Sequence, residues 1–194
     1  MNDVNDESLE YECIVIGASA GGMNALSAIL RALPDYFPLP LIIVQHRSRD
    51  YPDLLEKVLQ HKSRLTVNQA EEKVKIEKGF VYIAPPDYHL MIERNRTFSL
   101  SMDEPVNYSR PSIDVLFESA SEVYGKSLMG IILSGANRDG AAGMLTIHQN
   151  GGFTLAQDPK EAEYPYMPEA SIQLGTVRHV MKLKEIENFL IKLS

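Results

Sequence analysis

The sequence has no tryptophan, one cysteine and few aromatic residues, which make up 8% of its 194 positions. A single thiol excludes an internal disulfide and any metal site built from cysteines, and Cys13 lies in an apolar run where a buried thiol is the ordinary interpretation. No set of His, Asp or Glu residues has metal-ligand spacing either. We therefore expect no metal and no other cofactor.

Long hydrophobic runs are also absent, since no apolar stretch approaches the ~18 residues of a membrane span. The acidic start of the chain is opposite in charge to the beginning of a signal peptide. These two absences predict a cytoplasmic protein without membrane insertion.

Positive charge is scarce, because 19 Lys and Arg face 26 Asp and Glu and the net charge is -7. That balance has the wrong sign for binding a phosphate backbone, so we expect no nucleic-acid partner. Five of the acids lie in the first twelve residues without a base among them, and the rest of the chain is nearly neutral. We expect residues 1–10 to form a flexible acidic N-terminus and residues 11–194 to form one folded, monomeric domain.

From Tyr11 onward, short apolar runs alternate with segments of helical period. Unbroken apolar runs at 13–16 and 41–44 are typical of strands that are buried on both sheet faces. Residues 81–101 instead contain two alternating runs around a polar turn at 93–96, as in a hairpin. The pattern predicts an α/β fold: a doubly wound, mostly parallel sheet of about seven strands, with helices on both faces and a small antiparallel hairpin.

Three of the predicted strands are followed by residues that could perform hydrolysis. Ser19 lies in the glycine-rich turn 17–22, His46 follows the second strand, and Asp139 lies in the turn after the strand at 129–133. Ligands gather at the carboxyl ends of parallel strands, so the sheet could bring these side chains together across intervals of 27 and 93 residues. A serine becomes a nucleophile when an imidazole accepts its proton and a carboxylate orients that imidazole. We predict Ser19, His46 and Asp139 as a catalytic triad.

Each of these residues also has a structural interpretation. A glycine-rich turn is more often a phosphate or dinucleotide cradle, a lone histidine is more often a satisfied strand-end residue, and Asp139 is well placed to cap the following helix. A dinucleotide site would need an acid at the end of the second strand, where this chain has Gln45 and His46, and a phosphate-binding loop of the Walker type would need a lysine. Structural roles are favoured for His61, His148 and His179, whereas His89 could border the cleft.

The sequence resembles the catalytic domain of the chemotaxis receptor protein-glutamate methylesterases over nearly its whole length. The segments that carry the resemblance occur in the order of the family: GASAGG, IVQHRS, VYIAPPDYHL, SRPSIDVLFESASEVYG, IILSGANRDGAAGM, GGFTLAQD and MPEASIQLG. The triad of the family falls on Ser19, His46 and Asp139. The resemblance implies a serine hydrolase that removes methyl groups from glutamate γ-methyl esters on the cytoplasmic helices of chemoreceptors and deamidates receptor glutamines. It also implies oxyanion donors near Ala20 and Ala136.

The chain departs from the family pattern in places that bear on activity. The GMGxDG turn of the family reads Gly-Ala-Asn-Arg-Asp-Gly here, with Ala136 and Asn137 in place of methionine and glycine. Ala20 replaces a residue that commonly carries a hydroxyl, and Tyr164-Pro165-Tyr166 precedes the Met-Pro where the family usually has a glycine, which could narrow the rim of the cleft. We also expect no receiver domain before the catalytic domain. Two other hypotheses stand beside the hydrolase: a non-catalytic signalling module that keeps the fold, which the altered turn motivates, and a nucleotide-dependent oxidoreductase, which the glycine-rich turn at 17–22 suggests.

Overall fold

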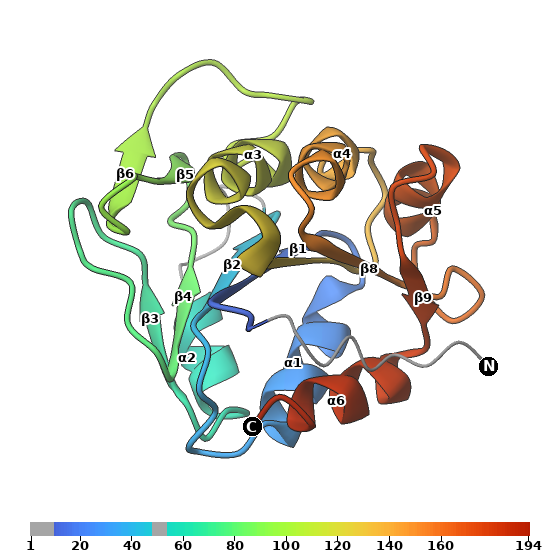
Figure 1. The fold of residues 1–194 in the computed structure, drawn as a ribbon, viewed down its shortest axis with the longest axis horizontal. Coiled ribbons are helices and arrows are strands. Elements are labelled where there is room, and N and C mark those ends of the chain that lie inside the picture. The colour runs from blue at the N-terminus through green and yellow to red at the C-terminus, as the bar shows by residue number, and fades with distance from the viewer. Residues whose placement is uncertain (1–9, 48–53) are drawn as a thin grey trace.

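The structure is a computed structural model that describes residues 10–47 and 54–194 (Figure 1). The predicted acidic N-terminus therefore lies outside the described residues, except for its last position.

A seven-stranded sheet forms the centre of the molecule, and all of its strand pairs are parallel. The order of the strands is β3-β4-β2-β1-β7-β8-β9. Their bounds are β1 Cys13–Ala18, β2 Leu41–Gln45, β3 Thr66–Gln69, β4 Phe80–Ile83, β7 Leu128–Ile132, β8 Phe153–Gln157 and β9 His179–Met181. Every residue of β1, β2, β7 and β8 is buried, which explains why these strands read as unbroken apolar runs.

Helices cover both faces of the sheet (Figure 1). One face packs against α1 Gly22–Ala32, α2 Leu55–Gln60 and α6 Leu183–Ile191, and the other against α3 Ile113–Tyr124, α4 Ala141–Gln149 and α5 Tyr166–Gln173. Successive strand residues point to opposite faces, so Ile14 and Ile16 enter one apolar core while Cys13 and Val15 enter the other. The doubly wound α/β fold predicted from the sequence is confirmed.

The antiparallel hairpin is present as β5 His89–Ile92 and β6 Phe98–Ser101, beside α3. The edge strand β3 is the element that the sequence analysis did not anticipate. It is four residues long and alternates between exposed or half-buried and buried positions, so it lacks an apolar run that would mark it as a strand.

The order of the strands places one crevice at the carboxyl end of β1. The chain passes from β1 to β2 on one side and returns to β7 on the other, so the connections leaving these neighbouring strands diverge. Ligand sites of open parallel sheets form at such a switch point. The loops that follow β1, β2 and β7 carry the three predicted triad residues. Within the described ranges, no helix is long and apolar enough to cross a membrane.

Candidate active site

The register of β1 and β2 brings Ser19 and His46 to the same place on the sheet edge. Ala18 is paired with Gln45, and the His46 N–H donates to the carbonyl of Ala18 at 3.0 Å. Ser19 and His46 are thus the next residues on two neighbouring strands, which run about 4.8 Å apart in a sheet. The 27-residue interval is closed by strand pairing.

The backbone of Ser19 is held from both sides. Its N–H donates to the Ser134 carbonyl at 2.9 Å, and its own carbonyl accepts from Gln45 Nε2 at 2.8 Å and from the Gly22 N–H at 2.9 Å. The hydroxyl of Ser19, in contrast, makes no hydrogen bond with any described residue. The nucleophile candidate therefore has a fixed backbone and a side chain that can turn.

The glycines after Ser19 are required by close packing. Gly21 has φ 73°, and a Cβ there would lie 2.7 Å from the Ser134 hydroxyl. A Cβ at Gly22 would lie 2.6 Å from the side chains of both Ala18 and Gln45. A side chain at either position would push the Ser19 turn out of place.

Two backbone N–H groups near Ser19 remain open. Neither the N–H of Ala20 nor that of Ala136 has an acceptor in the described part of the chain. These are the groups that the resemblance suggests as oxyanion donors.

His46 contacts Asp139 at the centre of the site. His46 Nε2 and Asp139 Oδ2 are 2.8 Å apart, the ring is 12% exposed, and the carboxylate is fully buried. The same carboxylate accepts from the Ser112 hydroxyl at 2.7 Å and from the N–H groups of Ile113 at 2.7 Å and Asp114 at 3.2 Å. Asp139 is thus fixed by donors on both oxygens.

These bonds differ from a simple cap on the following helix. Gly140 is the N-cap of α4, without a side-chain capping bond, while Asp139 accepts from the first turn of the neighbouring helix α3. Asp114 in that turn accepts in return from the Gly143 N–H in α4 at 2.7 Å. The two helices therefore exchange carboxylate caps, and this exchange sets the position of Asp139.

The two carboxylates differ in their pKa. Burial raises the pKa of Asp139, but the bonds from His46, Ile113 and Ser112 outweigh burial, and its pKa lies below the usual aspartate value. Burial raises the pKa of Asp114 to about 6, with a further contribution from the negative charge of Asp139. Asp139 is therefore ionised at neutral pH and can orient an imidazolium.

Asn137 faces the other nitrogen of His46. Its Oδ1 accepts the Asp139 N–H at 3.2 Å, so its Nδ2 is the atom that lies 3.4 Å from His46 Nδ1. Because an amide nitrogen only donates, Nδ1 must carry the lone pair and Nε2 the proton that is given to Asp139. This is the tautomer that a general base needs.

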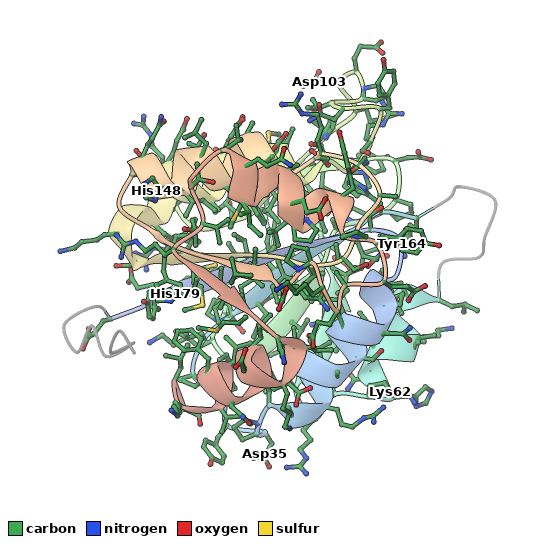
Figure 2. All side chains as sticks on the ribbon, turned by 90° about the vertical axis from the view of Figure 1, so that its right-hand side faces the viewer. Asp35, Lys62, Asp103, His148, Tyr164 and His179 are labelled. Carbon is green, nitrogen blue, oxygen red and sulfur yellow. The ribbon has the colours of Figure 1, made fainter. Side chains whose placement is uncertain are left out.

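The site is bordered by two loops. On one side, a cavity of about 310 Å³ is lined by His46, Arg47, Pro105, Tyr108, Ser109, Arg110 and Pro111. On the other side, Ser134 Oγ donates to the Ala20 carbonyl at 2.8 Å and accepts the Tyr164 N–H at 2.9 Å, which holds the 158–165 loop against the Ser19 turn. Tyr164, half-exposed, projects at this end of the molecule (Figure 2).

The remaining histidines lie away from the reacting groups. His89 is buried, with Nε2 donating to the Glu104 carbonyl at 3.1 Å and Nδ1 accepting the Ser112 N–H at 3.2 Å. It therefore helps to position Ser112, whose hydroxyl donates to Asp139. His148 and His179 lie on the side of the molecule opposite Tyr164 (Figure 2). His61 is an exposed residue that caps the end of α2.

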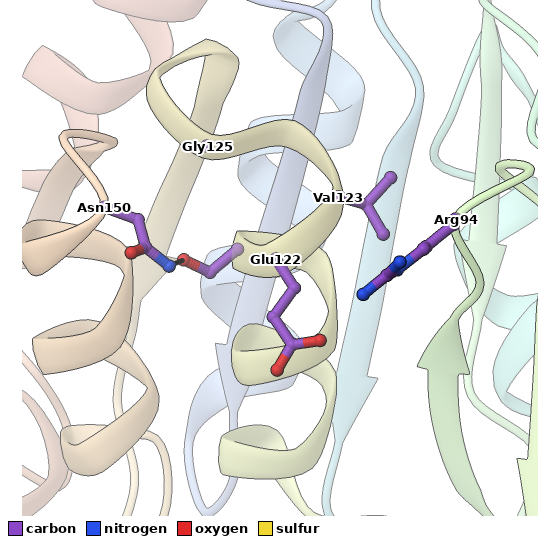
Figure 3. A pocket seen from close by; sticks show the side chains of 6 residues that line it. Arg94, Glu122, Val123, Gly125 and Asn150 are labelled. Carbon is purple, nitrogen blue, oxygen red and sulfur yellow. Dashed lines mark hydrogen bonds between the residues drawn. The ribbon is translucent and has the colours of Figure 1, made fainter.

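A larger cavity of about 660 Å³ lies at the opposite end of the sheet (Figure 3). Gly125, one of its lining residues, comes before β7, whereas the Asp139 loop follows β7. Its serine, Ser121, already donates to the Thr146 carbonyl at 3.2 Å. No cluster of three or more metal-binding side chains occurs among residues 10–47 and 54–194.

Sequence reasoning missed the residues that hold the predicted site residues in place. Gln45, Ser112 and Ser134 hold the Ser19 turn or the Asp139 carboxylate. Each has an ordinary polar side chain whose burial depends on tertiary contacts. The segment containing Ser112 contributed to the resemblance, which was the one available signal for it.

Comparisons with known proteins agree on one family. The family model described as CheB methylesterase matches residues 14–190. A curated protein of Leptospira interrogans, named putative protein-glutamate methylesterase/protein-glutamine glutaminase, is 49% identical over 186 residues and covers 96% of both chains. A relative from Carboxydothermus hydrogenoformans, named protein-glutamate methylesterase/protein-glutamine glutaminase 1, is 39% identical over 90% of this chain and 53% of its own length. The crystal structure of the CheB methylesterase catalytic domain of Thermotoga maritima superposes with a TM-score of 0.90 at 33% identity, over 96% of this chain and 100% of that one.

Proposed function

Because this chain belongs to the CheB methylesterase family, we propose that it hydrolyses glutamate γ-methyl esters in the cytoplasmic domains of chemoreceptors, and glutamine side-chain amides at such sites. Residues 11–194 form the catalytic domain in this proposal, acting as a cytoplasmic monomer without a cofactor. The observation that supports it best is the position of His46, which contacts Asp139 through Nε2 at 2.8 Å and follows the strand next to that of Ser19.

The first step is attack of Ser19 Oγ on the ester carbonyl. His46 Nδ1 accepts the hydroxyl proton, and Asp139, which already accepts from Nε2, stabilises the imidazolium that forms. The negative charge on the carbonyl oxygen is stabilised by the N–H groups of Ala20 and Ala136. One such donor contributes roughly 2.7 to 4 kcal/mol to lowering the barrier in a hydrolase.

The second half of the reaction releases methanol and then the acid. The bond between the carbonyl carbon and the methoxy oxygen breaks, and His46 gives its proton to the departing methoxide. Water then attacks the ester between Ser19 and the substrate, with His46 again as the base, and glutamate leaves. With a glutamine substrate the first leaving group is ammonia.

Asn137 has a place in this scheme that the family pattern would leave empty. Its amide lies 3.4 Å from His46 Nδ1, the atom that must accept the Ser19 proton. The amide holds the reactive tautomer before substrate binds, and it must give way to the Ser19 hydroxyl when the reaction begins.

The test is methanol release from receptor cytoplasmic fragments that carry labelled methyl groups. Ser19→Ala should lower turnover on the order of 10⁴- to 10⁶-fold, because the nucleophile is lost. Ser27→Ala, a change within α1, is the matched control and should retain wild-type turnover. Undiminished release by Ser19→Ala would refute the serine mechanism.

The two rival hypotheses receive less support. A non-catalytic module would be favoured if the imidazole of His46 lay beyond hydrogen-bond reach of its expected partners. Instead, His46 and Asp139 are in hydrogen-bond contact. The oxidoreductase hypothesis has no support from the comparisons, in which the relatives named above are methylesterases.

A further inference from the structure

We propose that the cavity beside His46 is a subsite for a carboxylate of the substrate polypeptide, bound by Arg110. The inference rests on the proposed function, and it adds a substrate preference: methyl esters with an acidic neighbour are better substrates than esters with a neutral one.

The cavity has the right place and size for this role. It measures about 310 Å³, and His46 is one of its lining residues, so a side chain bound in it lies next to the reacting ester. The volume exceeds that of a single glutamate side chain, which leaves space for part of the backbone that carries it.

Arg110 is held in the cavity wall by backbone carbonyls of the segment that precedes it in the chain. Its Nη1 donates to the carbonyls of Met102 at 2.8 Å and Asp103 at 3.0 Å. Two bonds on one nitrogen fix the plane of the guanidinium without using its other two nitrogens. A guanidinium held in this way loses little freedom when it binds a carboxylate.

The charge of Arg110 has no acidic partner. No carboxylate of the described residues forms an ion pair with it, and its Nε is buried without a hydrogen-bond acceptor. A half-buried cation whose nearest acceptors are two neutral carbonyls attracts an anion, and Nη2, which donates to no described residue, is the nitrogen left to bind a carboxylate.

Arg47, the other arginine of the cavity, is engaged differently. Its Nη2 donates to the Ala84 carbonyl at 3.2 Å and lies 3.5 Å from Glu56 Oε1. Glu56 offsets its charge, so Arg110 is the residue that a substrate carboxylate would meet as an uncompensated cation.

The surroundings favour a carboxylate of the substrate over a free polyanion. The protein carries a net charge of -7, so a highly charged anion is repelled at long range. A single carboxylate next to the target ester is carried into the cavity by the rest of the substrate. Tyr108, which is fully exposed at the cavity mouth, offers an aromatic face to the polypeptide that enters.

The experiment measures how the intact protein hydrolyses three substrates whose termini are blocked and uncharged. The first is a peptide with glutamate γ-methyl ester beside glutamate, and the second is the same peptide with glutamine in place of that glutamate. The third is the uncharged N-acetyl-glutamate γ-methyl ester α-amide. Wild-type protein should give a kcat/KM about 10-fold higher for the glutamate peptide than for the glutamine peptide, mainly through KM. Arg110→Gln should bring that ratio to about 1 and leave hydrolysis of the small ester unchanged, and Arg110→Lys should restore part of the ratio.

The matched control is Arg94→Gln, which removes the same charge at the larger cavity at the far end of the sheet (Figure 3). It should keep the wild-type ratio. If Arg110→Gln unfolds, its melting temperature and small-ester activity will fall together, and the salt dependence of the wild-type ratio then decides the question, since a local ion pair weakens as salt rises.

Equal kcat/KM for the two peptides in an active wild-type enzyme would overturn the subsite. So would a ratio that persists in folded Arg110→Gln, or one that does not respond to salt. Failure of the proposed function has a different signature, because it would appear as absent hydrolysis of all three esters, the uncharged one included.

Discussion

The two halves of the candidate active site are built to different degrees of rigidity. Asp139 is fully buried and accepts four close hydrogen bonds, from His46, Ser112, Ile113 and Asp114. Ser19, which follows the strand next to that of His46, has a fixed backbone but a hydroxyl without a partner among the described residues. The carboxylate that contacts the imidazole is therefore preorganised, whereas the Ser19 hydroxyl is not held by any described residue.

This division has a physical reason. A carboxylate that stabilises an imidazolium acts best when it does not have to reorganise as charge develops. A nucleophile has to leave its resting position, form a bond to carbon and return. Rigidity on the Asp139 side and freedom on the Ser19 side thus suit the parts that the two residues play in the proposed mechanism.

Among changes to the residues that contact the imidazole, the largest effect is expected from breaking the rigid half. Asp139→Asn should lower kcat about 10⁴-fold, because the amide no longer fixes the tautomer of His46 or stabilises its charge. The measurement is turnover of methyl-esterified receptor fragments, together with a thermal melt to show that the protein is folded.

Asp35→Asn is the control for Asp139→Asn, since Asp35 projects from the surface far from the site (Figure 2). Activity of Asp139→Asn within a few-fold of wild type would mean that the four bonds on Asp139 serve stability alone.

A smaller effect is expected from the boundary between the halves. Asn137→Asp places a carboxylate near His46 Nδ1, which favours a proton on that atom and removes the base. We expect the acid limb of the pH–rate profile to move to higher pH by roughly one unit, and turnover at pH 7 to fall by about 3-fold and by no more than about 10-fold, the limit for a shift of that size.

Asn137→Gly restores the residue of the family pattern and serves as the comparison for Asn137→Asp. It frees Nδ1 without adding charge, so turnover should stay within a few-fold of wild type while the tautomer becomes less fixed, which nitrogen NMR of the imidazole can detect. Identical pH–rate profiles for the Asp and Gly variants would show that Asn137 does not act on His46.

The two halves of the site also differ in how much of their geometry could be predicted from the sequence. Ser19 and His46 were predictable because each follows a buried apolar strand, and parallel strands end at a common edge. The placement of Asp139 at the same sheet edge was predictable, but its acceptor role at the start of α3 was not, because the bonds from Ser112 and Ile113 join residues 27 and 26 positions apart in the chain. The strand β3 was missed for a similar reason, since its pairing with β4 rather than its composition makes it a strand.

Arg110 and Asn137 show a further limit of the sequence. Both are polar residues in segments that resemble the family, yet the sequence did not show that either of them lies near His46. The roles that we propose for them depend on the path of the loop between β6 and α3 and on the orientation of an amide, which follow from tertiary contacts.

The smallest expected effect concerns stability, and it distinguishes the two carboxylates that cap α3 and α4. The raised pKa of Asp114 means that the folded state favours its protonated form, so this contribution to stability is present below about pH 4 and is lost as pH rises through about 6. Asp139 has a lowered pKa and titrates below this window. Wild-type protein should therefore lose about 2 kcal/mol of unfolding free energy between pH 4.5 and 7 relative to Asp114→Asn, measured by urea unfolding.

In Asp114→Asn the amide can accept from only one of the two groups that Asp114 serves, Gly143 N–H and Asn107 Nδ2, so the variant will be less stable at both pH values. That loss is common to the two conditions and cancels in the difference, as do the contributions of Glu118 and other groups that both proteins share. The difference in slope against pH therefore reports the titration of Asp114. If the unfolding free energies of the two proteins changed in parallel between pH 4.5 and 7, Asp114 would be ionised over this whole range. Both α3 and α4 would then be capped by charged carboxylates.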